Sequence, residues 1–193
     1  MNFDDYTFYL ASKSPRRRKL IKLLNIKFKS FSVDLNEELT DGEHPVATVK
    51  RLAKEKMLLA QKKIKAGIII TADTIVVLGD EILGKPSSPE EAVEYLKRLS
   101  GSWHTVITGF SILLEGRLIS SYEETRVKFK RLTAPEIEWY VSTGEPLDKA
   151  GAYGVQGKGA LFIERIDGDY YNVMGLPLGK IYDILTLELE LKR

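Results

Sequence analysis

The chain has 193 residues, of which 29 are Lys or Arg and 27 are Asp or Glu, so its formal net charge at pH 7 is +2. Hydrophobic residues make up 44% and charged residues 29%, which is typical of a folded globular protein. With no Cys and only two His, the sequence excludes disulfides, thiolate nucleophiles and cysteine-ligated zinc, and it argues against a Ser–His–Asp triad. A catalytic metal would need oxygen ligands, as Mg²⁺ or Mn²⁺ does. The nearly balanced charge argues against a general nucleic-acid-binding protein.

Nothing near the start of the sequence resembles a targeting segment. The first nine residues include Asp4 and Asp5 and no long apolar run, which is untypical of a signal peptide. The longest apolar runs, such as 68–70 and 75–78, are far shorter than the ~20 residues that span a bilayer. We therefore expect a cytoplasmic protein that does not enter a membrane.

Apolar periodicity and turn residues predict an alternation of strands and helices. In chain order the prediction is a strand at 8–11, a helix at 15–25, a strand at 28–33, a helix at 45–66 ended by Gly67, a strand at 68–74, a hairpin at 75–83, a helix at 89–99, strands at 106–114 and 118–129, a helix at 134–144, a strand at 160–166 and a helix from 178. No repeat or linker interrupts this order. We expect an α/β fold in a single domain over residues 1–193, with two lobes around a cleft.

Three predicted helices carry clear start signals. Ser14 is a good N-cap, and Pro15 suits the first helical position. Ser88 and Thr133 are each followed three residues later by Glu, which is the pattern of a capping box.

The first candidate site is the segment Ser12-Lys13-Ser14-Pro15-Arg16-Arg17-Arg18-Lys19. It begins a helix with cations, which the positive end of the helix dipole disfavours. A bound anion would offset that cost, and hydroxyls, helix amides and guanidinium groups all suit a phosphate. Taken alone, the segment is interpreted equally well as a solvated basic face or a loose RNA contact.

Asp73 is the second candidate. It follows an apolar run and is predicted to stand at the carboxyl end of a buried strand, where α/β sheets bind ligands. A carboxylate there can hold a divalent cation or take a proton from water. The alternative is an ordinary turn-starting Asp. We favour a functional role because the neighbouring sequence offers few cationic partners.

Other candidates are weak individually. Glu37 and Glu38 belong to an acidic loop, Lys56 lies within a predicted helix, and Lys85 stands between Gly and Pro. Together with the arginines and Asp73, they supply the cations and acids that triphosphate chemistry needs.

Residues 151–159 form a glycine-rich segment that contains Gln156. Its glycines allow a close backbone approach, and the Gln156 amide offers both a donor and an acceptor to a base edge. The segment lacks the Ser or Thr of a phosphate-binding loop, so on its own it is interpreted better as a structural loop.

Several of these segments, taken in order, resemble the Maf family of nucleotide pyrophosphatases, from residue 9 to about residue 185. The most specific are Ser-Pro-Arg-Arg at 14–17 and Asp-Lys-Ala-Gly-Ala-Tyr-Gly at 148–154. The others are Ala-Asp-Thr at 72–74, Gly-Lys-Pro at 84–86, Leu-Ser-Gly at 99–101 and Val-Met-Gly-Leu-Pro-Leu at 173–178.

The resemblance implies an elongated α/β/α fold with a mixed central sheet, similar to that of inosine triphosphatases. It also implies a cleft that hydrolyses nucleoside triphosphates to the monophosphate and pyrophosphate with a divalent metal, Mg²⁺ or Mn²⁺. The sequence matches the subgroup that acts on dTTP and UTP, and modified pyrimidine nucleotides are a further possible target. A homodimer is the expectation for the family.

The resemblance also implies residue roles. Asp73 matches the family's proposed general base and, with Glu37, is expected to hold the metal. Substrate choice in the dTTP/UTP subgroup is associated with the positions of Arg16, Thr74 and Gln156. The remaining matches to polar residues of the family's cleft are Ser12, Arg17, Lys56 and Lys85.

One departure and two alternatives remain open. The family commonly has Asp where this sequence has Asn36, so Glu38 stays an alternative to Glu37. A 7-methyl-GTP pyrophosphatase of the same family is the second-ranked activity. A septum or cell-division interaction protein, with the basic face Arg16–Lys19 contacting RNA or protein, is a further alternative.

Overall fold

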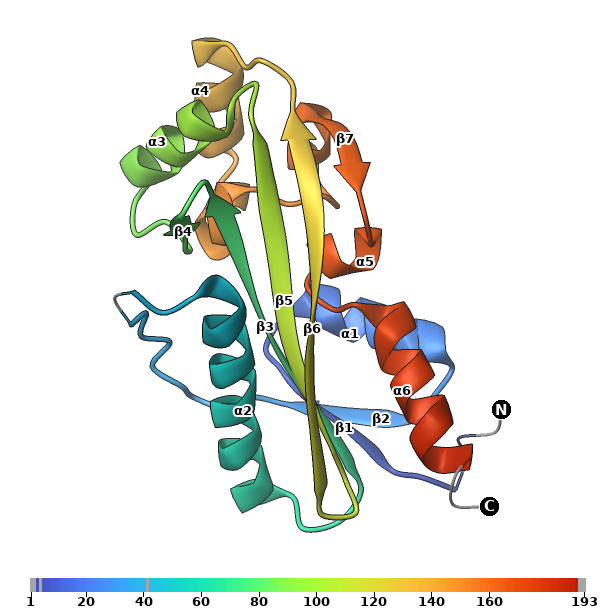
Figure 1. Cartoon of the computed structure of the whole chain (residues 1–193). Coiled ribbons are helices and arrows are strands. Elements are labelled where there is room, and N and C mark those ends of the chain that lie inside the picture. The colour runs from blue at the N-terminus through green and yellow to red at the C-terminus, as the bar shows by residue number, and fades with distance from the viewer. Residues whose placement is uncertain (1–2, 4, 41, 191–193) are drawn as a thin grey trace. The chain divides into compact units, whose positions relative to one another are not determined.

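The computed structural model describes residue 3 and residues 5–40 and 42–190. The helices and strands, in chain order, are β1 Phe8–Ala11, α1 Pro15–Ile21, β2 Phe28–Phe31, α2 Pro45–Lys63, β3 Ile68–Leu78, β4 Glu81–Leu83, α3 Pro89–Leu99, β5 Trp103–Leu114, β6 Arg117–Phe129, α4 Ala134–Ser142, β7 Ile163–Asp167, α5 Tyr170–Val173 and α6 Leu178–Glu190 (Figure 1). Short 3-10 helices cover Lys22–Leu24, Glu145–Asp148, Ala150–Ala152 and Lys158–Phe162. Among the described helices, none is both long and apolar enough to cross a membrane.

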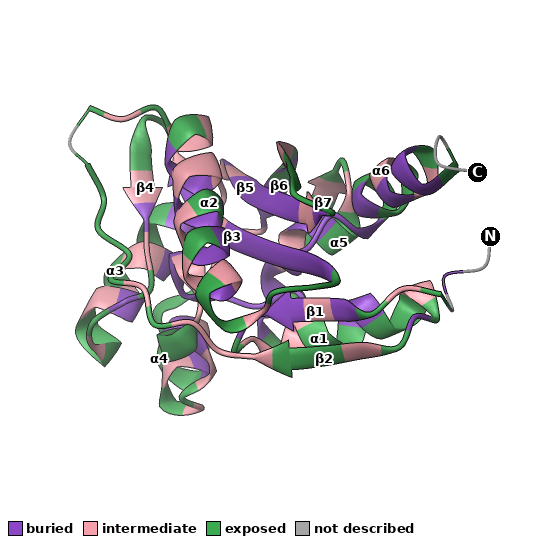
Figure 2. Ribbon diagram, turned by 90° about the horizontal axis from the view of Figure 1, so that it is seen from below, coloured by how far each residue is buried: buried purple, intermediate pink, exposed green. Residues whose placement is uncertain are grey.

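Within the described residues, seven strands form one sheet in the order β2-β1-β3-β5-β6-β7, with β4 paired to β3. β1 is parallel to both β2 and β3, whereas the pairs β3–β4 and β6–β7 are antiparallel. Strands buried on both faces read as continuous apolar runs, and β3 is buried along nearly its whole length (Figure 2). The predicted α/β class with a mixed sheet is confirmed.

The contacts divide the chain into two compact units. The first comprises Met1–Asp73, Thr108–Glu123 and Gly175–Arg193, and the second comprises Thr74–Ile107 and Glu124–Met174. Each of the strands β3, β5 and β6 contributes residues to both units. The single domain over 1–193 and the cleft stay predictions.

The first unit places α2 on one side of its strands, with α1 and α6 on the other (Figure 1). One cluster of its core joins α2 to β1 and β3 through Ala11, Met57, Ala60 and Ile69. A Cβ on Gly109 of β5 would lie 2.5 Å from the backbone of Val49, so α2 packs directly against that strand.

The second unit has a core built from strand and helix residues far apart in the sequence. Its fully buried members include Leu96 of α3, Phe129 of β6 and Tyr140 of α4. The last two rings pack edge-on against Phe162, with ring centroids 6.2 and 5.0 Å away respectively. This core carries the glycine-rich segment, since Ala152 and Tyr153 belong to it.

The predicted helix starts are largely confirmed. Ser14 accepts a hydrogen bond from the Arg17 amide, and Thr133 forms the complete capping box with Glu136. The Ser88 side chain likewise accepts from the Glu91 amide. However, the Glu91 carboxylate accepts hydrogen bonds from the amide and hydroxyl of Ser87. The return bond of this capping box therefore goes to Ser87, the residue before the N-cap Ser88.

Several predicted boundaries were wrong. The strand predicted at 28–33 ends at Phe31, and the strand predicted from residue 106 begins at Trp103. Helix α2 ends at Lys63 because Ile64 turns extended and packs against the apolar cluster beneath it. Gly67 instead shapes the entry into β3, where a Cβ would lie 2.6 Å from the Thr7 carbonyl oxygen. The strand predicted from residue 160 begins at Ile163, since Lys158–Phe162 forms a 3-10 helix.

Candidate active site

Asp73 stands in the interior of β3, so the prediction that it ends a strand was wrong. The strand continues because Thr74, Ile75 and Val76 are β-branched residues with no turn former among them. The Asp73 side chain is buried, with 5% of the residue exposed. A carboxylate inside a sheet needs a partner, because burying an unpaired charge is very costly.

Lys56 of α2 supplies that partner. Its ammonium donates to Asp73 Oδ1 and also lies 2.7 Å from Glu37 Oε1. Lys56 is itself only 8% exposed. Two carboxylates from different segments of the first unit therefore converge on one cation.

A buried hydrogen bond fixes α2 against β3 beside this cluster. The Thr71 hydroxyl donates to the Ala53 carbonyl oxygen over 2.7 Å. Thr71 lies two residues before Asp73, and Ala53 lies one helical turn before Lys56. The backbone positions of the ion pair are therefore set by a contact that does not involve the charges.

Arg17 reaches the same cluster from α1. Its Nε donates to the Gly175 carbonyl oxygen over 2.7 Å. Burial lowers the pKa of Arg17, while the negative charges of Asp73 and Glu37 work to raise that pKa and Arg16 to lower it further. Three cations and two carboxylates are thus close enough to interact.

Ser12 follows β1 directly and is buried. Its hydroxyl accepts a hydrogen bond from the Ser14 amide over 3.2 Å. The parallel pairing of β1 with β3 ends at Leu10 and Ile70. Ser12 and Asp73 follow these two residues by two and three positions, so both lie beyond the same end of the pairing. The structure thus groups Ser12, Arg16, Arg17, Glu37, Lys56 and Asp73 in the first unit.

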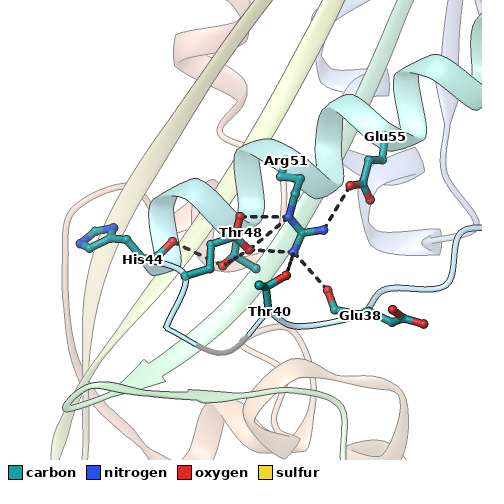
Figure 3. Close-up of polar contacts among 7 residues, drawn as sticks. Glu38, Thr40, His44, Thr48, Arg51 and Glu55 are labelled. Atoms are coloured by element: carbon teal, nitrogen blue, oxygen red, sulfur yellow. Dashed lines mark hydrogen bonds and ion pairs between the residues drawn. The ribbon is translucent and has the colours of Figure 1, made fainter.

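The acidic loop before α2 presents Glu37, and not Glu38, to Lys56. The Glu38 carboxylate accepts a hydrogen bond from the Asn36 side-chain amide. The backbone carbonyl oxygen of Glu38 accepts another from Arg51 Nη2 over 3.1 Å. Figure 3 shows the Arg51 guanidinium of α2 between Glu38 and Glu55. The geometry favours Glu37 of the two alternatives.

Arg51 and Glu43 form the anchor of this loop. The Nε and Nη2 atoms of Arg51 lie 2.9 and 2.7 Å from the two carboxylate oxygens of Glu43. The Thr48 hydroxyl also donates to this carboxylate over 3.0 Å. The guanidinium lowers the pKa of Glu43, and the carboxylate in turn raises the pKa of Arg51. Sequence reasoning missed Arg51, because nothing in its spacing indicates a loop contact.

The other predicted site residues, Thr74, Lys85 and Gln156, belong to the second unit. Lys85 is exposed on the connection from β4 to α3, and Gln156 is exposed on the glycine-rich segment. The two segments are joined, since the Gly151 amide donates to the Gly84 carbonyl oxygen over 3.0 Å. Thr74 is half-buried on β3.

The residues proposed to bind metal fit a hard cation in donor type. Nowhere in the described ranges do three or more His, Asp or Glu side chains group as a metal site. Glu37 and Asp73 nevertheless already converge on the positive charge of Lys56. Mg²⁺ is commonly held by one or two carboxylates, with water and substrate phosphates completing its coordination.

The two histidines and the aromatic pair of α4 have structural roles. His104 is a core residue whose Nε2 lies 2.8 Å from the Tyr153 hydroxyl, and His44 caps α2 through Nδ1. On α4, Tyr140 packs in the core, whereas Trp139 is 45% exposed. Adjacent residues of a helix point about 100° apart, so both rings cannot face one core.

The family model described as Maf-like protein matches residues 7–188. The chain belongs to the Maf family. A protein named dTTP/UTP pyrophosphatase from Thermosipho melanesiensis is 49% identical over 176 residues, covering 91% of this chain and 94% of its own length. Proteins of the same name from Aquifex aeolicus and Pyrococcus abyssi are 47% and 45% identical, over 91% and 92% of this chain and 92% and 94% of theirs.

Two solved structures share the fold of this Maf-family chain. A HAM1 protein from Coxiella burnetii gives a TM-score of 0.51 at 15% identity, over 94% of this chain and 98% of that one. The Ham1 protein of Staphylococcus aureus gives a TM-score of 0.51 at 15% identity, over 97% and 100%. At this identity the likeness concerns the mixed α/β fold alone.

Proposed function

We propose that this Maf-family protein hydrolyses dTTP and UTP to the monophosphate and pyrophosphate. The observation that carries the proposal is the cluster of the first unit, in which Asp73 and Glu37 meet on Lys56 beside Arg17. It combines a carboxylate able to accept a proton with cations able to bind phosphate. The names of the similar proteins supply the substrate class.

Asp73 is the proposed general base. Its carboxylate would accept a proton from the water that attacks the α-phosphorus, and a carboxylate has about four lone-pair sites, of which Lys56 uses one. The bond from the α-phosphorus to the bridging oxygen then breaks, and pyrophosphate leaves with that oxygen.

The cations of the cluster would stabilise the charge that develops on the phosphates. Arg16 and Arg17 can each present a planar fork of donors to phosphate oxygens, and Lys56 keeps the two carboxylates together. The hydroxyl of Ser12 is a further donor at the end of β1. Lys85 of the second unit is proposed to bind phosphate as well.

Glu37 and Asp73 are the proposed ligands of the divalent cation. When bound, Mg²⁺ or Mn²⁺ would neutralise part of the triphosphate charge. Glu37 reaches the position through a loop that Arg51 anchors, so its orientation depends on that anchor.

Gln156 is proposed to select the base. Its side-chain amide offers one donor face and one acceptor to the uracil or thymine edge, and Arg16 and Thr74 are proposed to assist in substrate choice. A modified pyrimidine nucleotide would satisfy the same pairing. Since these substrates are cytoplasmic nucleotides, we propose a cytoplasmic location, and we propose a homodimer, which light scattering would test.

The proposal is tested by a panel of dTTP, UTP, CTP, GTP and 7-methyl-GTP with Mg²⁺ or Mn²⁺, with pyrophosphate and orthophosphate measured separately. We expect pyrophosphate from dTTP and UTP, with kcat/KM at least ~10-fold above CTP and GTP, and none after chelation with EDTA. A preference for 7-methyl-GTP would assign the other activity of the family. Salt-sensitive RNA binding without turnover of any nucleotide would instead support the interaction protein.

A further inference from the structure

The glycine-rich segment of the second unit is organised by a single carboxylate, that of Glu145. Glu145 Oε2 accepts from the Lys158 amide over 3.0 Å, and Oε1 accepts from the Gly159 amide over 3.3 Å. Oε1 also accepts from the Tyr140 hydroxyl over 2.9 Å, and that hydroxyl in turn accepts from the Gly154 amide over 3.2 Å. Both ends of segment 154–158 are therefore tied to one side chain.

Two glycines of the segment are explained by this carboxylate and by the tyrosine bound to it. A Cβ on Gly157 would lie 2.3 Å from Glu145 Oε1, and a Cβ on Gly159 would lie 2.7 Å from the Tyr140 hydroxyl. Real Cβ atoms do not approach other atoms so closely. The close backbone approach that the sequence indicates is thus directed at Glu145 and Tyr140, inside the second unit.

Glu145 stays ionised in this position. Burial works to raise the pKa of Glu145, but hydrogen bonds from the Lys158 amide, the Tyr140 hydroxyl and the Gly159 amide outweigh burial, so the pKa lies below its ordinary value. An ionised carboxylate accepts hydrogen bonds at both oxygens and donates none. It therefore fits a set of partners that are all donors.

Gln156 is the middle residue of the tied segment. Its side chain is exposed, whereas Gly154 and Val155 before it are buried. We propose that Glu145 is a positioning residue for base selection, which holds both ends of segment 154–158 and thereby fixes the place of the Gln156 amide. The inference rests on the proposed base-reading role of Gln156.

The test compares Glu145→Gln with Glu138→Gln, which makes the same charge change at an exposed position of α4. The Gln side chain has the same shape as that of Glu, but an NH₂ group replaces one carboxylate oxygen. This donor would face the backbone amides that donate to Glu145. We expect Glu145→Gln to lower the UTP/GTP ratio of kcat/KM by about tenfold, the loss expected for one hydrogen bond to a charged group. Glu138→Gln should leave the ratio unchanged.

A double-mutant cycle separates positioning from general damage. In a Gln156→Ala background, Glu145→Gln should cause no further fall in the UTP/GTP ratio, because the residue it positions is gone. An equal fall in both backgrounds would overturn the inference, as would equal losses of UTP and GTP turnover. An unchanged ratio in Gln156→Ala marks failure of the proposed base-reading role of Gln156. If Gln156→Ala lowers the UTP/GTP ratio and Glu145→Gln leaves it unchanged, this inference alone fails.

Tyr140→Phe keeps the test decisive if Glu145→Gln does not fold. It removes only the hydroxyl that joins the Gly154 amide to Glu145. The expected result is a fall in the UTP/GTP ratio of about threefold, with faster hydrogen exchange at the Gly154 amide. An unchanged ratio together with faster exchange would overturn the inference.

Discussion

Asp73 is a buried carboxylate and Glu145 a half-buried one, and they differ in the kind of partner that holds them. Asp73 contacts a side-chain ammonium, which it shares with Glu37. Glu145 contacts two backbone amides and a tyrosine hydroxyl. A lysine side chain has several rotatable bonds and can shift toward an arriving phosphate, whereas backbone amides cannot move without the loop.

The two acids have different uses. The charges around Asp73 can rearrange around a ligand, because the backbone there is fixed independently by Thr71 and Ala53. The charge of Glu145 fixes the backbone itself, so it belongs to the fold of the segment. We therefore expect substitutions in the first region to change rate and substitutions in the second to change stability and selectivity.

The largest effect is expected from Asp73→Asn. General-base catalysis is typically worth ~10²–10⁴-fold, so UTP turnover should fall by at least that order. The fold should survive, since Lys56 keeps Glu37 as a partner. Steady-state pyrophosphate release and circular dichroism measure the two quantities. Asp80→Asn, at an exposed turn position, is the matched control. Near-normal UTP hydrolysis by Asp73→Asn would refute the assignment.

The second unit should lose stability in mild acid through His104. Burial lowers the pKa of His104 to about 4, below its ordinary value of 6.5. Between these pH values the unfolded chain binds a proton that the folded chain does not, so stability is full above about pH 6.5 and falls toward pH 4. Lowering the His104 pKa from 6.5 to about 4 corresponds to about 3 kcal/mol in the free energy of unfolding.

Urea unfolding between pH 4 and pH 7 measures this loss. His104→Phe should remove about 3 kcal/mol of the pH dependence, leaving that of the carboxylates. The same pH dependence in His104→Phe as in the unsubstituted protein would show that another group is responsible.

Gly157→Ala sharpens the comparison on the side of the loop. Its Cβ would lie 2.3 Å from Glu145 Oε1, a side chain that three hydrogen bonds keep in place. We expect a loss of about 1–3 kcal/mol in the free energy of unfolding, measured by urea titration. Gly179→Ala, where a Cβ meets no atom within 4 Å, should cost nothing. Equal stability of the two variants would mean that the carboxylate moves aside freely.

The smallest effect is expected from Arg51→Gln. Because Arg51 anchors the loop of Glu37 without touching its carboxylate, its loss should raise the Mg²⁺ concentration for half-maximal rate by ~10-fold. The kcat at saturating Mg²⁺ should change little. Arg98→Gln, which breaks a surface ion pair with Glu81, serves as the control. A fall in kcat that excess Mg²⁺ does not restore would contradict the anchoring role.

Local signals in the sequence were enough to predict most elements. Ser14 with Pro15 and Thr133 with Glu136 start their helices as predicted, because capping depends on residues within one turn. The tight turn between β5 and β6 was also predictable from Glu115 and Gly116, which both adopt positive φ.

Partners distant in the sequence were not predictable. Asp73 was expected to end a strand because it follows an apolar run, and the partner that lets it lie inside the sheet, Lys56, is 17 residues away in the sequence. The role of Glu145 depends on amides 13 and 14 residues further along the chain. Residue types alone do not fix such contacts.

The division of labour between the two regions is tested most directly by kcat/KM for UTP and for GTP in Asp73→Asn and Gln156→Ala. We predict that Asp73→Asn lowers both values by the same factor, because the triphosphate is common to both substrates. Gln156→Ala should lower the UTP value more than the GTP value. A changed ratio in Asp73→Asn, or an unchanged ratio in Gln156→Ala, would contradict the account.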